Sequence, residues 1–326
     1  MTRGPLVESV HRGSIAVVDE NGKLLAWAGE PEQVTYYRSS AKPIQAIPVV
    51  VSGAADKFDI QQDELAIICS SHSGEQQHVQ TVGKLLERVG LNEEFLLCGI
   101  HPPFHRPSAE EIYRKGNQPG PIHCNCSGKH SGMLALCQYY GWPLDNYLDL
   151  THPLQKMLLE TMHRFLSYEK IVLGVDGCGV PVYGMPLKIM AKGYARLVNP
   201  QVLPDVYQLA TKRLVAAMLA YPHVVGGTGR FDTELMETAA KDVLAKGGAE
   251  GVQCLGLVTK GLGIAIKIED GNARAAEPVA IEVLNQLGLL SDHKLYAMRH
   301  KHHPMIKNHR NEVVGELRPV FKLHLA

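Results

Sequence analysis

The stretch Cys124-Asn125-Cys126-Ser127-Gly128-Lys129-His130-Ser131-Gly132 carries two thiols, an amine, an imidazole and two serine hydroxyls. Apolar residues follow at the i, i+3, i+4, i+7 spacing of a helix, which we expect to run from about Ser127 to Tyr140. Gly141 and Pro143 predict its end. The reactive groups therefore belong to a helix N-terminus, where unpaired N–H groups and the positive end of the helix dipole favour thiolates and bound anions.

Composition indicates a soluble globular protein, since the 326 residues are 45% hydrophobic and 20% charged. Lys+Arg and Asp+Glu are both 33, so net charge is zero, which argues against nucleic acid or a membrane surface as the main partner. No apolar run approaches the roughly 20 residues of a membrane span, and no signal peptide is recognised. Seven cysteines without such a signal indicate reduced thiols in the cytoplasm. We find no internal repeat or domain boundary and expect one domain over residues 1–326.

A β-hairpin is predicted near the N-terminus. Short, mostly apolar runs at Ser14–Val18 and Leu24–Ala28 flank Asp19-Glu20-Asn21-Gly22, which has Asn-Gly in the hairpin position. A helix is then expected to begin near Ser39, because Pro43 suits a first helical turn, and Pro48 should kink or end its first part.

Two serine-containing segments carry candidate nucleophiles. Ser39 and Lys42 are three residues apart and share one face of the expected helix, and a desolvated lysine can act as the base for a serine. Taken alone, Ser-x-x-Lys also describes a serine cap beside an exposed lysine. The segment Cys69-Ser70-Ser71-His72-Ser73-Gly74-Glu75 precedes an expected helix at 77–89 and suits either a functional turn or a helix-capping loop.

Further thiols and glycines follow the opening stretch. A helix should begin at His152-Pro153, and a strand at Ile171–Val175 leads into Asp176-Gly177-Cys178-Gly179, where flanking glycines leave Cys178 open to close approach. Residues 98–123 indicate a long loop, whose three histidines are not favoured as metal ligands: His101, His105 and His123. Gly226–Asp232 is glycine-rich but matches neither a P-loop nor a GxGxxG pattern, which argues against a nucleotide site.

The C-terminal part predicts helices followed by a second hairpin. Helices are expected over about 183–222 and 232–244, with Lys246-Gly247-Gly248 closing the latter. Strands at 251–258 and 262–268 flank the turn Thr259-Lys260-Gly261. The remaining expectations are a helix over 279–287 begun by Pro278, a solvated basic face over 292–310 and a last strand over 313–321.

This order of elements resembles the serine β-lactamase and penicillin-binding-protein fold, whose members carry Ser-x-x-Lys on a helix and Lys-Thr-Gly on a strand. The resemblance implies an α/β (α+β) fold, with an antiparallel sheet from the N- and C-terminal parts, flanking helices and a helical region in the middle. Glycine replaces threonine in Lys246-Gly247-Gly248, and no Ser-Asp-Asn triplet occurs, which argues against β-lactamase activity.

A narrower resemblance is to the Rhizobium-type (class 3) L-asparaginases. It covers most of the chain in matching order, through Arg38-Ser39-Ser40-Ala41-Lys42-Pro43, Ser71-His72-Ser73-Gly74-Glu75, His101-Pro102-Pro103, Asn125-Cys126-Ser127-Gly128-Lys129-His130, Asp176-Gly177-Cys178-Gly179, Gly229-Arg230-Phe231 and Lys246-Gly247-Gly248-Ala249-Glu250-Gly251. The resemblance implies hydrolysis of L-asparagine to L-aspartate and ammonia, usually by a homodimer.

The asparaginase resemblance also implies a set of site residues. Two Ser–Lys pairs are implied, Ser39 with Lys42 and Ser71 with Lys246, and Lys260 is the alternative for the last place. Zinc is implied to be held by Cys126, Lys129 and Cys178. Two thiolates and one nitrogen suit tetrahedral zinc with an open position, although chemistry alone would select His130 over Lys129. Candidate substrate contacts are Arg38, whose guanidinium suits a carboxylate, and Ser73, His130 and Asp176.

The mechanism that we expect begins with attack of Ser39 on the side-chain amide, with neutral Lys42 as base. Ser71 and Lys246 would pass protons or raise the nucleophilicity of Ser39. Three alternatives stay open. The chain could be a glutaminase or a β-lactam or D-peptide hydrolase on the same fold, a hydrolase in which zinc makes the nucleophile, or a non-enzymatic zinc or regulatory binding protein.

Overall fold

The computed structural model describes residues 1–326. The chain divides into two compact units, of which unit 1 is Met1–Ser40, Met185–Asn199 and Glu234–Ala326, and unit 2 is Ala41–Gly184 and Pro200–Thr233. No helix combines the length and the apolar character that crossing a membrane requires. The single domain over 1–326 stays a prediction.

Unit 1 is built on a six-stranded sheet in the order β13-β4-β3-β10-β9-β8, in which every neighbouring pair is antiparallel. Strands from both ends of the chain meet where β3 pairs with β10, with Ala16 opposite Ala265. The strands are β3 (Gly13–Val18), β4 (Leu24–Ala28), β8 (Val243–Gly248), β9 (Val252–Leu257), β10 (Leu262–Ile268) and β13 (His324–Leu325). The predicted antiparallel sheet with flanking helices and a separate helical region is thereby confirmed.

The expected N-terminal hairpin is present as β3 and β4. Its turn forms because the Asp19 carboxylate accepts hydrogen bonds from the backbone N–H groups of Asn21 and Lys23, at 2.9 Å each. Gly22 takes a φ of 85°, a left-handed conformation that glycine adopts without strain.

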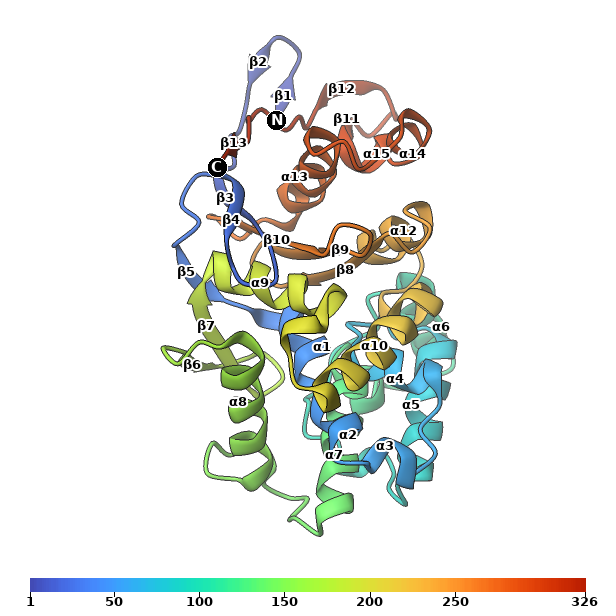
Figure 1. Cartoon of the computed structure of the whole chain (residues 1–326). Helices are drawn as coiled ribbons and strands as arrows, with labels where there is room; N and C mark the ends of the chain where they lie inside the picture. The colour runs from blue at the N-terminus through green and yellow to red at the C-terminus, as the bar shows by residue number, and fades with distance from the viewer. The chain divides into compact units, whose positions relative to one another are not determined.

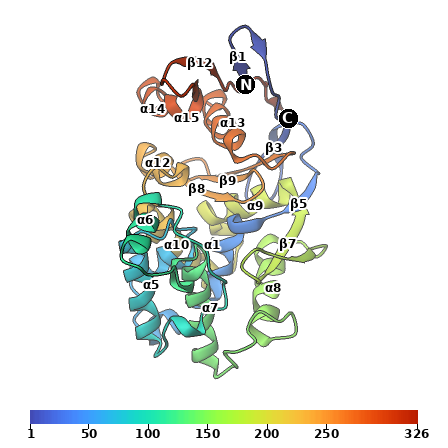
Figure 2. The ribbon, with the colours of Figure 1, turned by 180° about the vertical axis from the view of Figure 1, so that it is seen from behind.

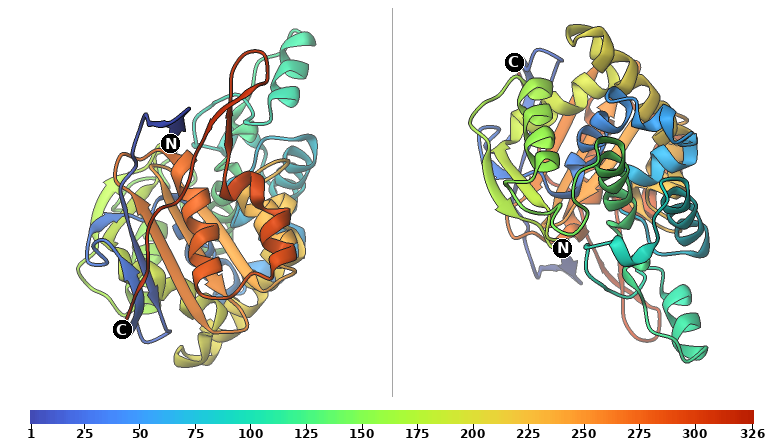
Figure 3. Two further views of the ribbon diagram at one scale, coloured as in Figure 1. Left: turned by 90° about the horizontal axis from the view of Figure 1, so that it is seen from above. Right: turned by 90° about the horizontal axis from the view of Figure 1, so that it is seen from below.

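Helices α9 (Leu187–Val198) and α13 (Ala273–Gln286) cover opposite faces of this sheet (Figure 1), as the view from behind also shows (Figure 2). From above, α13 runs along the C-terminal strands (Figure 3, left). The approach of α9 depends on Gly263 of β10, because a Cβ there would lie 1.9 Å from the carbonyl oxygen of Ala191. The smaller elements of unit 1 are β1 (Thr2–Arg3), β2 (Leu6–Val7), β5 (Val34–Tyr36), α14 (Asp292–Ala297), α15 (Arg299–His302), β11 (Met305–Lys307) and β12 (Val313–Glu316).

Unit 2 is mainly helical and contains the short hairpin of β6 (Val172–Val175) with the first part of β7 (Pro181–Pro186). Its helices, visible from below in Figure 3 (right), are α1 (Lys42–Gln45), α2 (Ile47–Val51), α3 (Ala54–Lys57), α4 (Gln62–Ile68), α5 (Gln76–Arg88), α6 (Arg106–Arg114), α7 (Ser127–Tyr140), α8 (Pro153–Leu166), α10 (Asp205–Ala220) and α11 (Pro222–Val225). Helix α4 is at the centre and packs against α5, α7, α10 and α11.

The packing of α7 on α4 positions the opening stretch of the sequence analysis. Helix α7 has the predicted bounds, and Gly141 ends it with a φ of 69°. A Cβ at Gly128 would lie 2.2 Å from the Ile67 carbonyl oxygen, and one at Gly132 would lie 2.6 Å from Ile68 Cγ2. These two glycines therefore bring the N-terminal end of α7 against the end of α4, directly before the segment that contains Ser71.

Several predicted elements differ from the structure. Helix α12 (Phe231–Thr238) ends earlier than expected, because the chain turns through Ala240 and Lys241 with φ of 53° and 73°. Lys246-Gly247-Gly248 therefore lies within strand β8, not at a helix end. The loop expected over 98–123 contains α6, which has Pro107 in its first turn, where proline is tolerated.

The C-terminal region also departs from the predictions. Helix α13 begins at Ala273 because the Asn272 side chain caps it, so Pro278 lies inside the helix. In the region expected to be a solvated basic face, His302 is buried and its Nε2 hydrogen-bonds the Glu282 carboxylate at 2.8 Å. Of the last strand predicted over 313–321, only the first part forms a strand, β12, and β13 lies beyond the predicted segment.

Candidate functional site

In unit 1, the segment that carries Ser39 is the 3₁₀ turn Arg38–Ala41, of which unit 1 contains residues 38–40. Ser39 itself is half-buried, between half-buried Arg38 and fully buried Ser40. Arg38 has a φ of 51°, a left-handed conformation that is strained for a residue with a side chain. Such strain persists only where surrounding contacts enforce it, so the contacts that hold this turn also position Ser39.

Those contacts come from β8 and α9. The Ser40 hydroxyl donates to the backbone carbonyl of Lys246 at 2.8 Å, and the Tyr194 hydroxyl donates to the Ser40 carbonyl at 2.9 Å. A Cβ at Gly248 would lie 3.1 Å from Arg38 Cβ and 3.2 Å from Ser40 Oγ. The Lys-Gly-Gly sequence thus places a buried lysine, followed by glycine backbone without side chains, beside the turn that holds Ser39.

Lys246 is fully buried on β8, and its Nζ donates to the Gly247 carbonyl at 2.8 Å. Lys260, the alternative to Lys246, lies in the turn between β9 and β10. Unit 1 therefore brings together Arg38, Ser39 and Lys246 through the backbone of β8.

In unit 2, a buried lysine contacts a buried serine. Lys42 is 1% exposed, and its Nζ donates to Ser71 Oγ at 2.9 Å, to the Ser70 carbonyl at 2.6 Å and to the Asn125 carbonyl at 3.3 Å. The contact of Lys42 with Ser71 was not anticipated, because both the spacing and the asparaginase resemblance pair Lys42 with Ser39. The amine is thus held by two backbone carbonyls and the Ser71 hydroxyl.

His72 links the serine segment to the opening stretch. Its Nδ1 accepts from the Gly74 N–H at 3.1 Å, so that the Nε2–H donates to Ser127 Oγ at 2.8 Å. Burial, with nearby His78 and Lys42, holds the pKa of His72 well below its usual value, so the ring is neutral. Ser73, the next residue, is buried, and its hydroxyl donates to the Gly226 carbonyl at 2.9 Å.

The predicted metal ligands lie together at the N-terminal end of α7. Lys129 Nζ is 3.0 Å from Cys178 Sγ, and the Cys126 thiol hydrogen-bonds those of Cys124 and Cys178. All four side chains are buried. The chain contains no group of three His, Cys, Asp or Glu residues arranged to hold a metal. The nitrogen donor proposed for this cluster is a lysine, which is not among those residue types.

Charges in the cluster support one another. The hydrogen bonds from Cys124 and Cys178 lower the pKa of Cys126 well below its usual value, and Lys42 and Lys129 act in the same direction. Burial works to lower the pKa of Lys129, but the thiols of Cys178 and Cys126 outweigh it, so that this pKa is raised. The pKa of Cys178 is raised, chiefly by its hydrogen bond to Cys126 and by burial. The arrangement is that of one thiolate held between thiols and an ammonium group.

The two further residues expected in the site flank this cluster. His130 Nδ1 is 2.7 Å from the Tyr147 hydroxyl, while its Nε2 is buried without a hydrogen-bond partner. Burial, with Lys129 next to it, holds the pKa of His130 well below its usual value. Asp176 is half-buried at the end of β6, and the Gly177 N–H donates to its carboxylate at 2.9 Å. The Tyr147 contact was missed because nothing in the sequence marks that residue.

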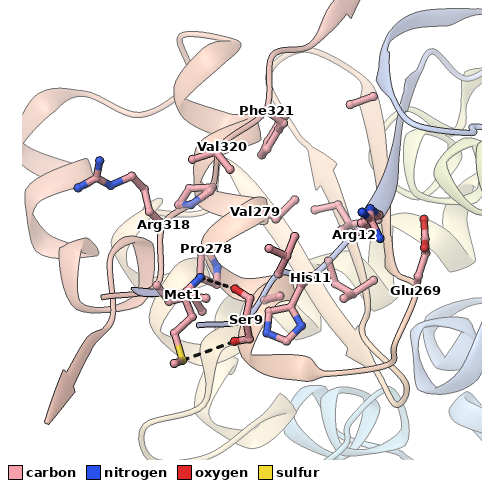
Figure 4. Close-up of a pocket in the computed structure, with 18 of the residues that line it drawn as sticks. Met1, Ser9, His11, Arg12, Glu269, Pro278, Val279, Arg318, Val320 and Phe321 are labelled. Carbon is pink, nitrogen blue, oxygen red and sulfur yellow. Dashed lines mark hydrogen bonds between the residues drawn. The ribbon is translucent and has the colours of Figure 1, made fainter. Parts of the chain in front are cut away.

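The three histidines of residues 98–123 make hydrogen bonds to nearby polar groups. His101 hydrogen-bonds the side chain and backbone of Asn125 at 3.0 Å, His105 bonds Ser108 and His123 bonds Gly120. A cavity of about 640 Å³ in unit 1 is also separate from the predicted site residues. It is lined by the N-terminal segment around His11, by α13 and by residues 316–321 (Figure 4).

The fold and the site define a mixed α/β protein in which buried lysine amines accompany serine hydroxyls, an arrangement that can activate a hydroxyl nucleophile. Comparison with protein families identifies its group: the L-asparaginase II model matches residues 1–319, and the chain belongs to that family. It is accordingly an enzyme of the amidohydrolase type, and the expected resemblance to asparaginases is confirmed at this level.

The comparison with curated proteins found no match. Among solved structures, a mutant of simvastatin synthase from Aspergillus terreus has a TM-score of 0.42 at 12% identity, covering 78% of this chain and 86% of that one.

Proposed function

We propose that the protein hydrolyses the side-chain amide of L-asparagine to L-aspartate and ammonia. The observation that carries this proposal is the contact of Lys42 Nζ with Ser71 Oγ at 2.9 Å, in a buried site of a member of the L-asparaginase II family. A small neutral amide needs a nucleophile, a base and a proton donor for its leaving group, and serine and lysine side chains supply all three.

Ser39 is proposed as the nucleophile because it is half-exposed, whereas Ser71 is buried. In the proposed cycle Lys42 first gives up a proton, because its Nζ donates to three oxygens in the structure and a neutral amine has only two N–H groups. The Ser39 oxygen then attacks the amide carbon while its proton passes to the neutral Lys42 amine. The carbon–nitrogen bond then breaks, ammonia leaves with a proton from the same amine, and water hydrolyses the aspartyl ester. We assign Ser71 and Lys246 to proton transfer around this cycle, since the Ser71 hydroxyl already accepts from Lys42.

Substrate binding is assigned to four side chains. Arg38 suits the substrate α-carboxylate, because guanidinium binds carboxylates through two parallel hydrogen bonds. His130 is assigned to the bound substrate because its buried Nε2 has no other partner. Asp176 can accept from the substrate ammonium, and the Ser73 oxygen can accept a second hydrogen bond beside the one that its hydroxyl donates to Gly226.

Zinc is proposed as the resident metal, held by Cys126, Lys129 and Cys178. Two sulfur donors and one nitrogen fit tetrahedral zinc with an open position, and the thiolate character of Cys126 suits ligation. The raised pKa of Lys129 means that its amine must lose a proton before it can bind the metal, so occupancy should increase with pH. When bound, zinc would supply a fixed positive charge beside the substrate.

Ammonia release by the purified protein tests the proposed activity, with L-asparagine and L-glutamine compared at equal concentration. Ser39→Ala should lower kcat by about 10³-fold or more and leave metal content unchanged. The matched control is Ser9→Ala, since Ser9 lies near the N-terminus and hydrogen-bonds only Met1 and Arg274. Activity retained in Ser39→Ala would reject Ser39 as the nucleophile. Faster ammonia release from L-glutamine would reject L-asparagine as the substrate.

Metal analysis tests the zinc proposal separately from activity. Cys178→Ser should lose most of its zinc. The matched control is Cys137→Ser, which should keep its zinc. Cys137 is also buried and lies on the same helix as Lys129, but burial raises its pKa to about 12, so it is not expected to be a thiolate ligand. Equal zinc content in both variants would remove Cys178 from the ligand set.

We also propose a cytoplasmic homodimer. Seven free cysteines, all buried, support a reducing compartment, and the family resemblance supports the dimer. Light scattering coupled to gel filtration should give twice the 35.8 kDa chain mass, and a monomer mass would refute the assembly.

A further inference from the structure

We propose that Glu75 is a positioning residue for the candidate site: it binds the segment Ser71–Glu75, the serine loop, to the segment Val225–Thr228, the glycine loop. This inference rests on the proposed function for its effect on catalysis. The contact itself stands on geometry within unit 2. No role in the proposed reaction has been given to either Glu75 or the glycine loop.

The two loops are bonded along their length. The Ser71 backbone N–H donates to the Val225 carbonyl at 3.0 Å, and the Ser73 hydroxyl donates to the Gly226 carbonyl at 2.9 Å. The orientation of both serines therefore depends on where the glycine loop lies.

Glu75 closes the far end of this contact. One carboxylate oxygen accepts from the Thr228 backbone N–H at 2.7 Å, and the other accepts from the Thr228 hydroxyl at 2.9 Å. His223 Nε2 lies 3.3 Å from the second oxygen. Burial works to raise the pKa of Glu75, but the Thr228 hydrogen bonds and His223 outweigh it, so the group stays ionised at neutral pH. A bidentate, charge-assisted contact of this kind is stronger than a surface ion pair.

Three stacked imidazoles support the same contact. His78 accepts from the Glu75 backbone N–H at Nδ1 and donates from Nε2 to the His223 carbonyl at 2.9 Å. Its ring stacks on His223 with 5.4 Å between centroids and on His72 with 5.2 Å. Because His72 is bonded to Ser127, the contact extends to the N-terminal end of α7.

Gly227 allows the loops to approach this closely. A Cβ there would lie 2.5 Å from a Glu75 carboxylate oxygen and 2.8 Å from the Ser73 Cβ and Oγ. Its φ of 118° is also a conformation that residues with side chains rarely adopt. Glycine at this position thus serves the Glu75 contact, which gives the glycine-rich segment a role that requires no nucleotide.

The effect on catalysis follows from the position of Ser71. Lys42 donates to the Ser71 hydroxyl, so a displaced serine loop would misalign the proposed proton-transfer groups. Of the four proposed substrate contacts only Ser73 lies on this loop, so most of the substrate binding should be kept. A misplacement of about 1 Å can lower the rate about 100-fold. We therefore expect Glu75→Ala to lower kcat by about 10- to 100-fold while KM changes less than about 3-fold.

The test combines kinetics with amide hydrogen exchange on the full-length protein. Exchange of the peptide that covers 226–230 should be at least about 10-fold faster in Glu75→Ala, because the Thr228 N–H loses its acceptor. Glu75→Gln retains that acceptor and should recover most of kcat, which a merely destabilised fold would not do. Glu111→Ala, which breaks the exposed ion pair between α6 and Lys115 directly after it, is the matched control and should behave as wild type.

The outcomes separate this inference from the proposed function. Faster exchange with the kcat loss and its recovery in Glu75→Gln supports the inference. Unchanged exchange, or faster exchange with unchanged kcat, overturns it. If wild type releases no ammonia from asparagine, the proposed function fails and the exchange data alone decide the loop contact. If Glu75→Ala does not fold, Thr228→Val removes one of the two hydrogen bonds and should give a smaller change in the same direction.

Discussion

Acidification should destabilise the protein through two buried histidines, His72 and His78. Burial is the main cause that lowers the pKa of each, from an ordinary value of 6.5. The unfolded chain therefore binds more protons than the folded chain below about pH 6.5, so the free energy of unfolding falls as the pH falls. This loss continues down to the lower pKa of the folded state.

The magnitude follows from linkage. A histidine that stays neutral in the folded state and titrates at 6.5 in the unfolded state contributes about 1.4 kcal/mol of destabilisation between pH 7.5 and pH 5.5. His72 should contribute that full amount, since it is completely buried, and His78 a part of it, since its pKa is lowered less. The two together should cost between about 1.4 and 2.8 kcal/mol.

Urea unfolding at pH 7.5, 6.5 and 5.5, followed by circular dichroism, measures this dependence. Cys126, His130 and His302 also have lowered pKa values and add to the slope in the same direction. Variants are therefore compared with wild type, and the absolute slope is not used. The free energy of unfolding of His72→Gln should be lower than that of wild type at pH 7.5. Between pH 7.5 and pH 5.5 it should fall by about 1.4 kcal/mol less than that of wild type. His309→Gln, at an exposed position, is the control.

Two results would refute the reasoning. The first is a free energy of unfolding that does not fall between pH 7.5 and pH 5.5. The second is an equal pH dependence in wild type and His72→Gln, which would mean that the buried ring takes up a proton in the folded state as readily as in the unfolded one.

Three further predictions concern how the structure holds the site. Ser40→Ala removes the hydroxyl that donates to the Lys246 carbonyl, so it should lower the free energy of unfolding by about 1 to 3 kcal/mol in urea and also lower kcat. An unchanged kcat would show that the Ser39 turn does not need this bond. Gly263→Ala should yield little folded protein on expression, because its Cβ would meet the Ala191 carbonyl oxygen at 1.9 Å, and a normal thermal midpoint would contradict that packing. Asn272→Ala should cost about 1 kcal/mol through loss of the α13 cap, and wild-type stability would count against its capping role.

Local signals in the chain were sufficient for most of the elements around the site. The apolar period and Gly141 predicted the bounds of α7 as the structure has them, because a periodic apolar run with a glycine stop is a short-range pattern. The β3–β4 hairpin followed from Asn-Gly between two apolar runs. Lys246 was misplaced at a helix end because the left-handed turn at Ala240 and Lys241 has no sequence signature.

The sequence by itself determined which chemical groups are present, and the order of its motifs identified the asparaginase family. Only the tertiary structure decided which of these groups touch. Lys42 begins α1 and Ser71 follows α4, 29 residues later in the chain, yet their side chains are in hydrogen-bond contact, a long-range packing that residue spacing cannot encode. In the same way, Lys129 and Cys178 are 49 residues apart in the chain and 3.0 Å apart in the fold. Spacing along the chain predicts contacts within one helix, whereas contacts between distant segments depend on how buried surfaces fit together.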